Sequence, residues 1–419
     1  MNNSEVFDWI VIGGGIAGVT TSEILTREGH SVLLLEKNDE LVSETSKVFH
    51  EWLHTGSLFT LVPDNLVTTR FVLGAIDDLL EYYHSFQRMN LQPTSSGLKV
   101  INEDGWFNNK NIDYLYRNRK NPVWLANVSR SIGVVNKIKQ HDWLRRRAGS
   151  MYGDSRLSRR NWVDKIPSML FNKNKFTKIT SPDITMNSRI LISDILNQSL
   201  QNGLVVKTSS NVTSILKKNN LISVKTKECG YASQNVLVCS PDLVSKLFNK
   251  NITTSYAPIA VVENVPSDCN CFVELDYYLK RCINLLVKGN GIGQAGGITV
   301  SNKSEIAPYM KYVINEHKKR NPSLLVIDQY VGLKKELTSK KQERNYLYHI
   351  EEQESKVWSL VLGKFTLAFS AAPEFYRRVY HKNPTKFFDT SFGIDINPII
   401  SKTSWQEIID NKESKNGND

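Results

Sequence analysis

The chain has 419 residues, of which 40% are hydrophobic, so it is long enough for two connected domains built around a large core. No segment approaches the roughly 20 consecutive apolar residues that a membrane-spanning helix needs, which excludes an integral membrane protein but leaves open a peripheral contact with the inner face of a membrane. The formal net charge of +11 is compatible with an anionic substrate, an acidic membrane surface or nucleic acid, and solubility is its simplest explanation.

A glycine-rich motif follows the first apolar run. That run, Trp9 to Ile12, is too short for a secretion signal and predicts a buried strand. It leads into Gly13-Gly14-Gly15-Ile16-Ala17-Gly18 and then into a predicted helix that ends at Arg27, the setting in which a GxGxxG motif binds a dinucleotide. There the first glycine of the motif permits a tight turn, the second lets the backbone approach a diphosphate, and the last lets the helix pack closely on the strand. The cofactor contacts expected here are Gly13, Gly15, Ile16, Ala17 and Gly18.

A second predicted strand, Ser31 to Leu35, ends at Glu36. An acidic residue at this point accepts hydrogen bonds from the ribose hydroxyls of the adenosine, and Lys37 beside it is expected on the adenine side. A glutamate in place of an arginine argues against a 2′-phosphate and therefore against NADP. The motif alone leaves FAD and NAD both open.

The stretch from Glu44 to Gly56, with the sequence ETSKVFHEWLHTG, resembles the FAD-binding region of the D-amino-acid oxidase superfamily, and in particular its glycerol-3-phosphate dehydrogenase branch. In that branch a Thr-Ser pair is followed at this distance by a His-Gly-Gly stretch. Here Thr45 and Ser46 match the pair, while His54 and Gly56 match the ends of the stretch and a threonine replaces its middle glycine. The resemblance implies FAD as the cofactor, with the Thr-Ser pair at the diphosphate and the second stretch against the isoalloxazine ring.

Arginines alternate with aromatic residues between Trp143 and Trp162, a composition typical of phosphate-binding surfaces. Because the chain has no recognisable nucleic-acid module, we interpret this stretch as a solvated face and expect no nucleic-acid partner. The five cysteines form no CxxC pair and have no histidine at metal-ligand spacing, so we expect no metal site. Reduced thiols of this kind favour a cytoplasmic location.

The middle of the chain continues the resemblance. A helix is predicted from Ile190 to Leu200, a strand from Leu204 to Val206 and a hairpin from Ile215 to Thr226. The resemblance implies that Val212, just before the hairpin, contacts the adenine through its backbone. The strand that starts at Val236 is similar to one that ends in Ala-Thr-Gly beside the ADP half in the family. Here it continues as Cys-Ser-Pro, which argues against a second, nicotinamide site.

Two segments nearer the C-terminus complete the resemblance. Tyr330 to Lys334 is similar to a Gly-Leu-Arg segment that lines the substrate site of the dehydrogenases, with Lys334 replacing the arginine. A cationic role would survive this replacement, but bidentate recognition of an anion would not. After a predicted strand that ends at Leu362, the chain resembles the Gly-Gly-Lys-x-Thr turn that places a helix N-terminus under the flavin pyrimidine. Leucines replace its first glycine and its second threonine, and the implied cofactor contacts are Gly363, Lys364, Phe365 and Thr366.

The expected fold class is α/β, with a Rossmann-like FAD-binding domain and a mixed-sheet substrate domain. The first would be assembled from residues 1–61, 162–246 and 346–400 and the second from residues 62–161 and 247–345. Residues 401–419 would form a polar tail that is mobile after Trp405. In the second domain, strands joined by turns are predicted at Phe272 to Tyr278, Arg281 to Leu286 and Lys288 to Gly297. The five glycines of the last segment fit hairpin turns and a substrate-lining loop equally well.

Flavin chemistry at a carbon next to nitrogen or oxygen needs a base and groups that position the substrate, but no nucleophile from the protein. His54 is the candidate base, and a structural role in its loop is the equal alternative. Arg281, Lys334 and Arg344 are candidate anchors for an anion, or else surface charges. Tyr348 is a candidate for orienting the substrate, or else packs within its strand.

Together these segments predict an FAD-dependent oxidoreductase that oxidises a C–N or C–O bond of a small polar, anionic metabolite by hydride transfer to flavin N5. Two alternatives are a non-catalytic binding protein that keeps the fold, as the Rab escort and dissociation-inhibitor proteins do, and an NAD-dependent dehydrogenase. Retention of Glu36, Thr45, Ser46 and Thr366 argues against the first alternative. The second leaves the Thr-Ser pair and the turn at Gly363 without a purpose. Neither the substrate nor the compound that re-oxidises the flavin follows from the sequence.

Overall fold

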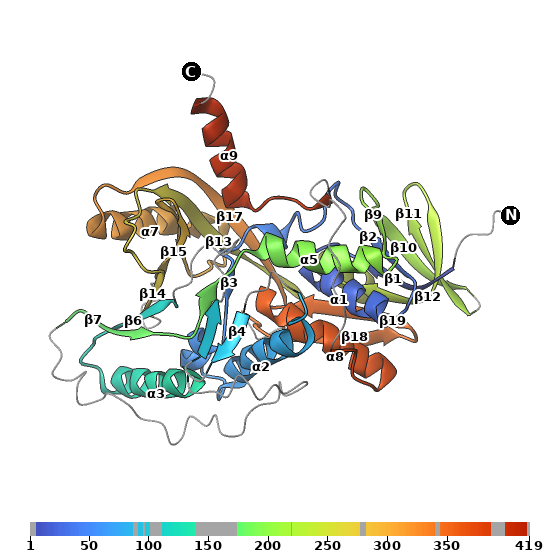
Figure 1. Ribbon diagram of the computed structural model, residues 1–419, viewed down its shortest axis with the longest axis horizontal. Coiled ribbons are helices and arrows are strands. Elements are labelled where there is room, and N and C mark those ends of the chain that lie inside the picture. Colours follow the sequence, from blue (N-terminus) through green and yellow to red (C-terminus); the bar gives the residue numbers. More distant parts are fainter. Residues whose placement is uncertain are drawn as a thin grey trace.

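Two large β-sheets form the frame of the molecule (Figure 1). The computed structural model describes residues 6–86, 91–94, 97–100, 111–139, 174–218, 220–276, 282–339, 344–386 and 399–416. One sheet has eight strands and carries the glycine-rich turn, and the other has seven. No helix within these described ranges is both long and apolar enough to cross a membrane.

The eight-stranded sheet is built around a parallel centre. β1 (Val6–Ile12) pairs in parallel with β2 (Val32–Leu35) on one side and with β12 (Gly230–Val238) on the other. β9 (Val205–Lys207) extends the sheet beyond β2, and β19 (Val357–Leu362) lies parallel to β12. The antiparallel strands are β10 (Val212–Lys218), β11 (Leu221–Thr226) and β18 (Tyr348–Glu354). This sheet confirms the predicted α/β fold class.

Alternate side chains of β1 enter two different hydrophobic cores, because successive residues of a strand point to opposite faces of the sheet. Trp9 and Val11 belong to the larger core, which helices cover, and Ile10 and Ile12 belong to a smaller core on the other face. Burial on both faces accounts for the continuous apolar run that marked this strand in the sequence. The helices over the larger core are α1 (Ile16–Arg27), α5 (Ser188–Gln201) and α8 (Ala368–Tyr380), and α6 (Pro241–Phe248) contributes to the smaller one.

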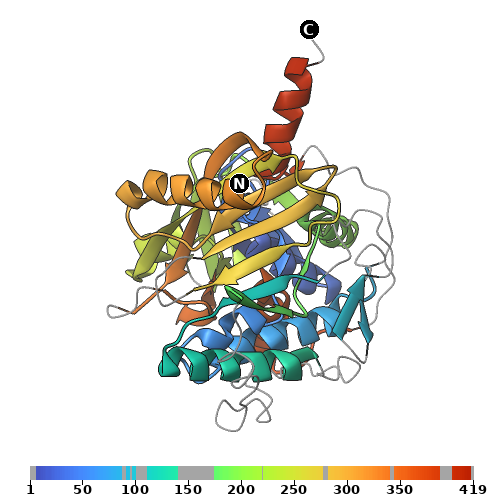
Figure 2. The same ribbon diagram turned by 90° about the vertical axis from the view of Figure 1, so that its left-hand side faces the viewer.

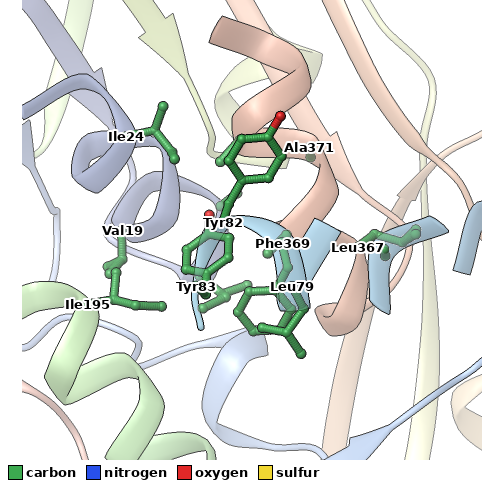
Figure 3. Close-up of a cluster of buried hydrophobic side chains, with 14 of the residues drawn as sticks. Val19, Ile24, Leu79, Tyr82, Tyr83, Ile195, Leu367, Phe369 and Ala371 are labelled. Carbon is green, nitrogen blue, oxygen red and sulfur yellow. The ribbon is translucent and has the colours of Figure 1, made fainter. Parts of the chain in front are cut away.

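The larger core also receives α2 (Val67–Tyr82), which packs against α8. Figure 3 shows Tyr83 close to Phe369 of α8, with Val19 of α1 nearby. The rings of Tyr83 and Phe369 meet edge to face with their centroids 5.4 Å apart, and both side chains are fully buried. This packing holds α1, whose N-terminus follows the glycine-rich turn, in a fixed position on the sheet.

The seven-stranded sheet has the order β17-β13-β16-β15-β14-β6-β7, and all its neighbours are antiparallel except the parallel pair of β14 and β6. Figure 2 shows its strands side by side, with α7 (Ile306–Arg320) packed over them. A second helix, α3 (Pro122–Lys139), packs against β6 and β14. The strands are β6 (Asp113–Arg117), β7 (Phe176–Thr180), β13 (Ile252–Glu263), β14 (Phe272–Leu275), β15 (Ile283–Gly289), β16 (Ile292–Gly297) and β17 (Leu325–Leu337).

Short elements connect the two sheets. The important one is a two-stranded sheet in which β3 (Trp52–Leu53) pairs with β8 (Ile184–Thr185). The 3-10 helices η1 (Thr45–Lys47), η2 (Ser57–Leu61) and η8 (Phe365–Leu367) lie at or near the motif residues, and η7 (Lys303–Glu305) precedes α7. β4 (Leu91–Thr94) and β5 (Gly97–Val100) form a separate hairpin.

Three details differ from the sequence-based expectations. The segment expected to be a polar, mobile tail contains a helix, α9 (Ser404–Asn416), which projects from the molecule (Figures 1 and 2) and is anchored by the buried Trp405. The predicted break at residue 287 is absent, because β15 runs through to Gly289 and the turn follows at Asn290. β7 lies in the second sheet although it falls within the predicted cofactor segment 162–246, and the division into domains stays a prediction.

Candidate functional site

A cavity of about 510 Å³ opens at the carboxyl ends of the parallel strands. Its walls include the residues that follow β1, β2, β12 and β19, which is where ligands bind in parallel α/β sheets. Residues 43–46, 210–213 and 334–336 add further walls. The cavity therefore passes from the glycine-rich turn to the two C-terminal motif segments.

The N-terminus of α1 faces this cavity without a side-chain cap. Gly13 has a φ of 111°, and a Cβ on Gly18 would stand 1.9 Å from the Gly13 carbonyl oxygen, so both glycines are required by the turn itself. The backbone N–H of Ile16 donates to the Ser46 hydroxyl at 3.1 Å. A helix end with a positive dipole and no side-chain cap from its own N-cap residue suits an anionic group such as a diphosphate.

Arg189 supports the Thr45–Ser46 segment from behind. Its Nη2 donates to the Ser46 carbonyl oxygen at 2.9 Å, and the side chain is fixed at the start of α5, where Asn187 caps the helix. Burial lowers the pKa of Arg189 to about 10, so the guanidinium remains charged at neutral pH. None of the motifs in the sequence contains this arginine.

Glu36 directly follows β2, and its side chain lies at the cavity wall. Its Oε2 accepts from the backbone N–H of Gly14 at 2.6 Å and its Oε1 from that of Asn38 at 2.9 Å. These bonds fix the carboxylate, which retains lone pairs for further donors such as two ribose hydroxyls. Val212 and Lys37 line the same part of the cavity, as expected for residues near an adenine.

Four charged side chains form a cluster at the other end of the cavity, which we call the cation cluster: Lys334, Arg344, Lys364 and Glu336. Arg344 donates to both carboxylate oxygens of Glu336, at 2.7 and 2.8 Å. Lys364 Nζ lies 4.8 Å from the ring centroid of Tyr346, and Lys334 Nζ lies 5.2 Å from that of Phe49. The cluster thus contains three cations and one carboxylate, and both lysines line the cavity.

Both lysines of the cation cluster have lowered pKa values. Burial and the neighbouring Arg344 lower the pKa of Lys334 to about 8. Burial, Lys334 and Arg344 together lower the pKa of Lys364 well below its usual value. Because an anion between them would offset both the desolvation and the mutual repulsion, the cluster is suited to binding one.

His54 lies between the cation cluster and a buried aspartate. Its backbone N–H donates to the Thr366 hydroxyl at 3.3 Å, and its Nδ1 lies 3.6 Å from Asp183 Oδ2. Burial lowers the pKa of His54 to about 4, a shift that Asp183 opposes and Lys364 reinforces. The imidazole is therefore neutral at pH 7 and able to accept a proton.

The loop before His54 is fixed by a second buried charge that sequence reasoning missed. Glu51 has a φ of 57° and pairs with Lys288 at 3.0 Å, with both side chains almost fully buried. Its carboxylate also accepts from the Ser188 hydroxyl at 2.6 Å and from the Trp405 indole at 2.9 Å. Glu51 thereby connects β15, α5 and α9 to the segment that lines the cavity.

Some predicted site residues lie elsewhere. Tyr348 is buried in β18 with its ring 5.7 Å from Phe71 and does not line the cavity. Gly56, with a φ of 96°, is required by the conformation of its loop, because a Cβ there would stand 2.4 Å from the Thr69 carbonyl oxygen. None of the five glycines between 288 and 297 lines the cavity, and two of them, Gly289 and Gly291, flank the hairpin turn. Arg281 and the arginine-rich stretch between residues 143 and 162 lie outside the described residues.

The residues that the cavity does bring together are most of the predicted cofactor contacts and two of the catalytic candidates. Gly18, Thr366 and Arg344 support its walls without lining them. Those on the wall are Gly13, Gly15, Ile16, Ala17, Glu36, Lys37, Thr45, Ser46, His54, Val212, Lys334, Gly363, Lys364 and Phe365. Among the described residues, no group of three or more His, Cys, Asp or Glu side chains is placed to hold a metal ion.

Comparisons with known proteins identify the family of the chain. The model of a family described as FAD dependent oxidoreductase matches residues 8–259. UDP-galactopyranose mutase of Mycoplasma pneumoniae is 41% identical over 58 residues, but the match covers 12% of this chain and 14% of that protein.

Solved structures resemble the whole chain in fold. L-amino acid deaminase from Proteus vulgaris superposes with a TM-score of 0.62 at 14% identity, covering 95% of this chain and 94% of that one. L-α-glycerophosphate oxidase from Mycoplasma pneumoniae, solved with FAD bound, superposes with a TM-score of 0.61 at 15% identity. The match covers 91% of this chain and 97% of that one. Glycine oxidase from Geobacillus kaustophilus superposes with a TM-score of 0.62 at 11% identity. The match covers 95% of this chain and 98% of that one.

Proposed function

Because this chain belongs to the family of FAD-dependent oxidoreductases, we propose that it oxidises a C–N or C–O bond of a small, polar, anionic metabolite. Family membership confirms the predicted cofactor and the predicted class of enzyme. When bound, FAD supplies the hydride acceptor at its N5 atom. The observation that supports the proposed substrate class is the cation cluster, which reaches the same cavity as the glycine-rich turn.

We assign the cofactor's ADP half to the glycine-rich end. The N-terminus of α1 and the Ser46 hydroxyl would hold the diphosphate, and Glu36 would accept hydrogen bonds from the ribose. The residues fit because the helix end carries no acidic side chain in its first turn and the carboxylate of Glu36 is already oriented by two backbone N–H groups. This leaves the end with Gly363 and Lys364 for the isoalloxazine ring.

The cation cluster is proposed to bind the anionic group of the substrate. Lys334 and Lys364 carry lowered pKa values because burial and mutual repulsion disfavour two charges side by side. A carboxylate or phosphate group between them would raise both pKa values and so favour the charged form of each lysine. Amino acids and glycerophosphate, which the names of the similar solved structures mention, carry such groups.

His54 is proposed as the base that removes the proton from the substrate's amine or hydroxyl. It is neutral at pH 7, since burial lowers its pKa to about 4. A pKa this low makes a weak base in the free enzyme. The substrate's anion would raise this pKa, because it screens Lys364 and Lys334, which lower the pKa of the histidine in addition to burial.

A screen for flavin bleaching without oxygen tests this proposal. Amino acids, amines, hydroxy acids and sugar derivatives are each mixed with the FAD-loaded enzyme, and we expect bleaching by compounds with a carboxylate or phosphate but not by their neutral amides or esters. Lys364→Gln should weaken binding of the active compound about 10-fold or more, which corresponds to about 1.4 kcal/mol. Lys311→Gln, at an exposed position of α7, is the matched control. Bleaching by neutral analogues at equal concentration would refute the proposed substrate class.

A cytoplasmic location stays a prediction from the cysteine pattern. All five cysteines, which the structure describes, are free thiols: Cys229, Cys239, Cys269, Cys271 and Cys282.

A further inference from the structure

We infer that Asp183 is a positioning residue that holds His54 as the imidazole protonated on Nδ1. The lone pair of Nε2 is then free to accept a proton from a substrate in the cavity. This inference rests on the proposed function for the role of His54 as a base. Asp183 belongs to none of the motifs in the sequence, and it reaches the site through the short pairing of β3 with β8.

Asp183 is a fully buried carboxylate surrounded by neutral donors. Its Oδ2 accepts from the Tyr114 hydroxyl at 2.6 Å and from the Trp52 indole N–H at 2.8 Å. Its Oδ1 accepts from the backbone N–H of Thr55 at 2.8 Å and from the hydroxyl of the same residue at 2.5 Å. Four hydrogen bonds thus hold the carboxylate in one orientation, with no freedom to turn away from His54.

These donors keep Asp183 ionised inside the protein. Burial alone would raise its pKa, but the contact with His54 and the hydrogen bonds from Thr55 and Tyr114 outweigh burial and lower it. A full negative charge therefore stands 3.6 Å from His54 Nδ1. That distance is slightly longer than a hydrogen bond, as is common for catalytic pairs before a substrate binds.

The imidazole of His54 is fixed on its other sides as well. Its ring lies 4.5 Å from the centroid of the Trp52 ring and 5.4 Å from that of Phe59. Nδ1 is buried, while 13% of the side chain is exposed, so the exposed part belongs to its other atoms, and the residue lines the cavity. A neutral imidazole has a single N–H, and a carboxylate beside Nδ1 draws that hydrogen to Nδ1.

This arrangement assigns a task to each group in the reaction. Bound FAD would supply the acceptor for the hydride that leaves the substrate's C–H bond, while the proton of the substrate's N–H or O–H would pass to His54 Nε2. A C=N or C=O double bond forms in the substrate. The imidazolium that results lies beside the Asp183 carboxylate, whose charge stabilises it. The other charged or titratable groups near His54 are Lys334, Lys364 and the neutral His50.

Nitrogen-15 NMR of the FAD-loaded protein, labelled in its eight histidines, reads the tautomer directly. His54→Gln identifies the His54 signals by their loss. In the wild type we expect a protonated Nδ1 and an unprotonated Nε2 at neutral pH. In Asp183→Asn we expect the proton to move to Nε2, because the amide group of asparagine can donate to Nδ1 where the carboxylate only accepts.

Tyr114→Phe is the matched control. It removes one hydrogen bond from the same carboxylate and leaves the charge in place, so it should lower stability but keep the wild-type tautomer. If Asp183→Asn does not fold, the wild-type and Tyr114→Phe spectra decide the question without it. A proton on Nε2 in the wild type, or an unchanged tautomer in folded Asp183→Asn, overturns the inference.

A kinetic comparison separates this inference from the proposed function. With a compound that bleaches the wild type, Asp183→Asn should slow flavin reduction about 100-fold or more and leave the dissociation constant within 2-fold, since the residue does not touch substrate. If the NMR result is as expected but no anionic compound bleaches the flavin, the proposed function fails and the tautomer assignment stands. If bleaching occurs at the wild-type rate in Asp183→Asn, the inference fails alone.

Discussion

The backbone N–H of Ile16 donates a 3.1 Å hydrogen bond to the Ser46 hydroxyl, which joins the first turn of α1 to η1. Both residues line the cavity. We expect a diphosphate bound there to be within reach of both the helix N–H groups and the Ser46 hydroxyl. Arg189, which donates to the Ser46 carbonyl oxygen, holds η1 in place.

Gly15→Asp should abolish FAD binding. A Cβ at this position would point toward Ser46, whose hydroxyl oxygen would lie 3.4 Å away, so the new carboxylate would occupy and repel the diphosphate position. Flavin absorbance per mole of purified protein measures the effect. Gly230→Ala, where a Cβ meets nothing within 4 Å, should keep full occupancy, and full occupancy in Gly15→Asp would place the diphosphate elsewhere.

Glu36→Gln should weaken FAD binding about 10- to 100-fold, the effect of losing a charged acceptor worth about 1–3 kcal/mol. The amide nitrogen of glutamine cannot accept from the Gly14 N–H that Glu36 now satisfies. Titration of the apoprotein with FAD gives the dissociation constant. Glu228→Gln, at an exposed position, serves as control, and equal affinities for the two variants would exclude a role for Glu36 at the ribose.

The eight-stranded sheet could be predicted because its signals are local. Trp9 to Ile12, the glycines after it and the acid at the end of the next strand fix a strand, a turn, a helix and a strand without reference to the rest of the chain. The end of the chain could not be predicted in this way. α9 forms although its sequence is polar, because the buried Trp405 and the ion pair of Lys412 with Glu263 attach it to distant segments.

The site residues also fall into two groups, those that local motifs predict and those that only the tertiary structure brings together. The predicted cofactor contacts that line the cavity belong to motifs whose spacing carries meaning, whereas Asp183 and Lys288 lie far from any motif. They enter the site through tertiary pairing of β3 with β8 and of β15 with β16. Tyr348 illustrates the opposite error, since a tyrosine in a predicted strand near a motif packs into the larger core instead of the cavity.

Binding of an anion at the cation cluster should weaken as pH rises. Lys334, with a pKa lowered to about 8, and Lys364, with a pKa well below its usual value, lose their protons as pH rises through those values, and an anion binds the protonated forms. The affinity for sulfate, followed by its perturbation of the flavin spectrum, should therefore be higher at pH 6 than at pH 9. If the affinity for sulfate does not depend on pH, the cation cluster does not bind the anion.

Glu51→Gln should destabilise the protein by about 3–5 kcal/mol, because it leaves the buried Lys288 ammonium without its counter-charge. Thermal unfolding with FAD bound measures the loss. Glu263→Gln breaks a partly exposed pair with Lys412 and should cost about 1 kcal/mol or less. Similar losses in the two variants would mean that Glu51 is not held as a buried ion pair.

Acid should destabilise the fold through Glu51 and Asp183. Both carboxyls have pKa values below their ordinary 4.5 and 3.8, since Lys288 and the hydrogen-bond donors outweigh burial. Carboxyls with lowered pKa values contribute full stability above their unfolded pKa, and the contribution disappears as pH falls through the folded pKa. At pH values below about 4.5 the melting temperature should decrease. The decrease should be less steep in Glu51→Gln than in the wild type. Parallel pH curves for the two proteins would exclude Glu51 as a source of this dependence.

The crystal structure of the FAD-loaded protein tests the central claim most directly. The diphosphate should lie within hydrogen-bonding distance of the first N–H groups of α1, with Glu36 at the ribose and the isoalloxazine ring beside His54 and Lys364. A cofactor bound elsewhere, with the glycine-rich turn making no contact to it, would contradict the claim.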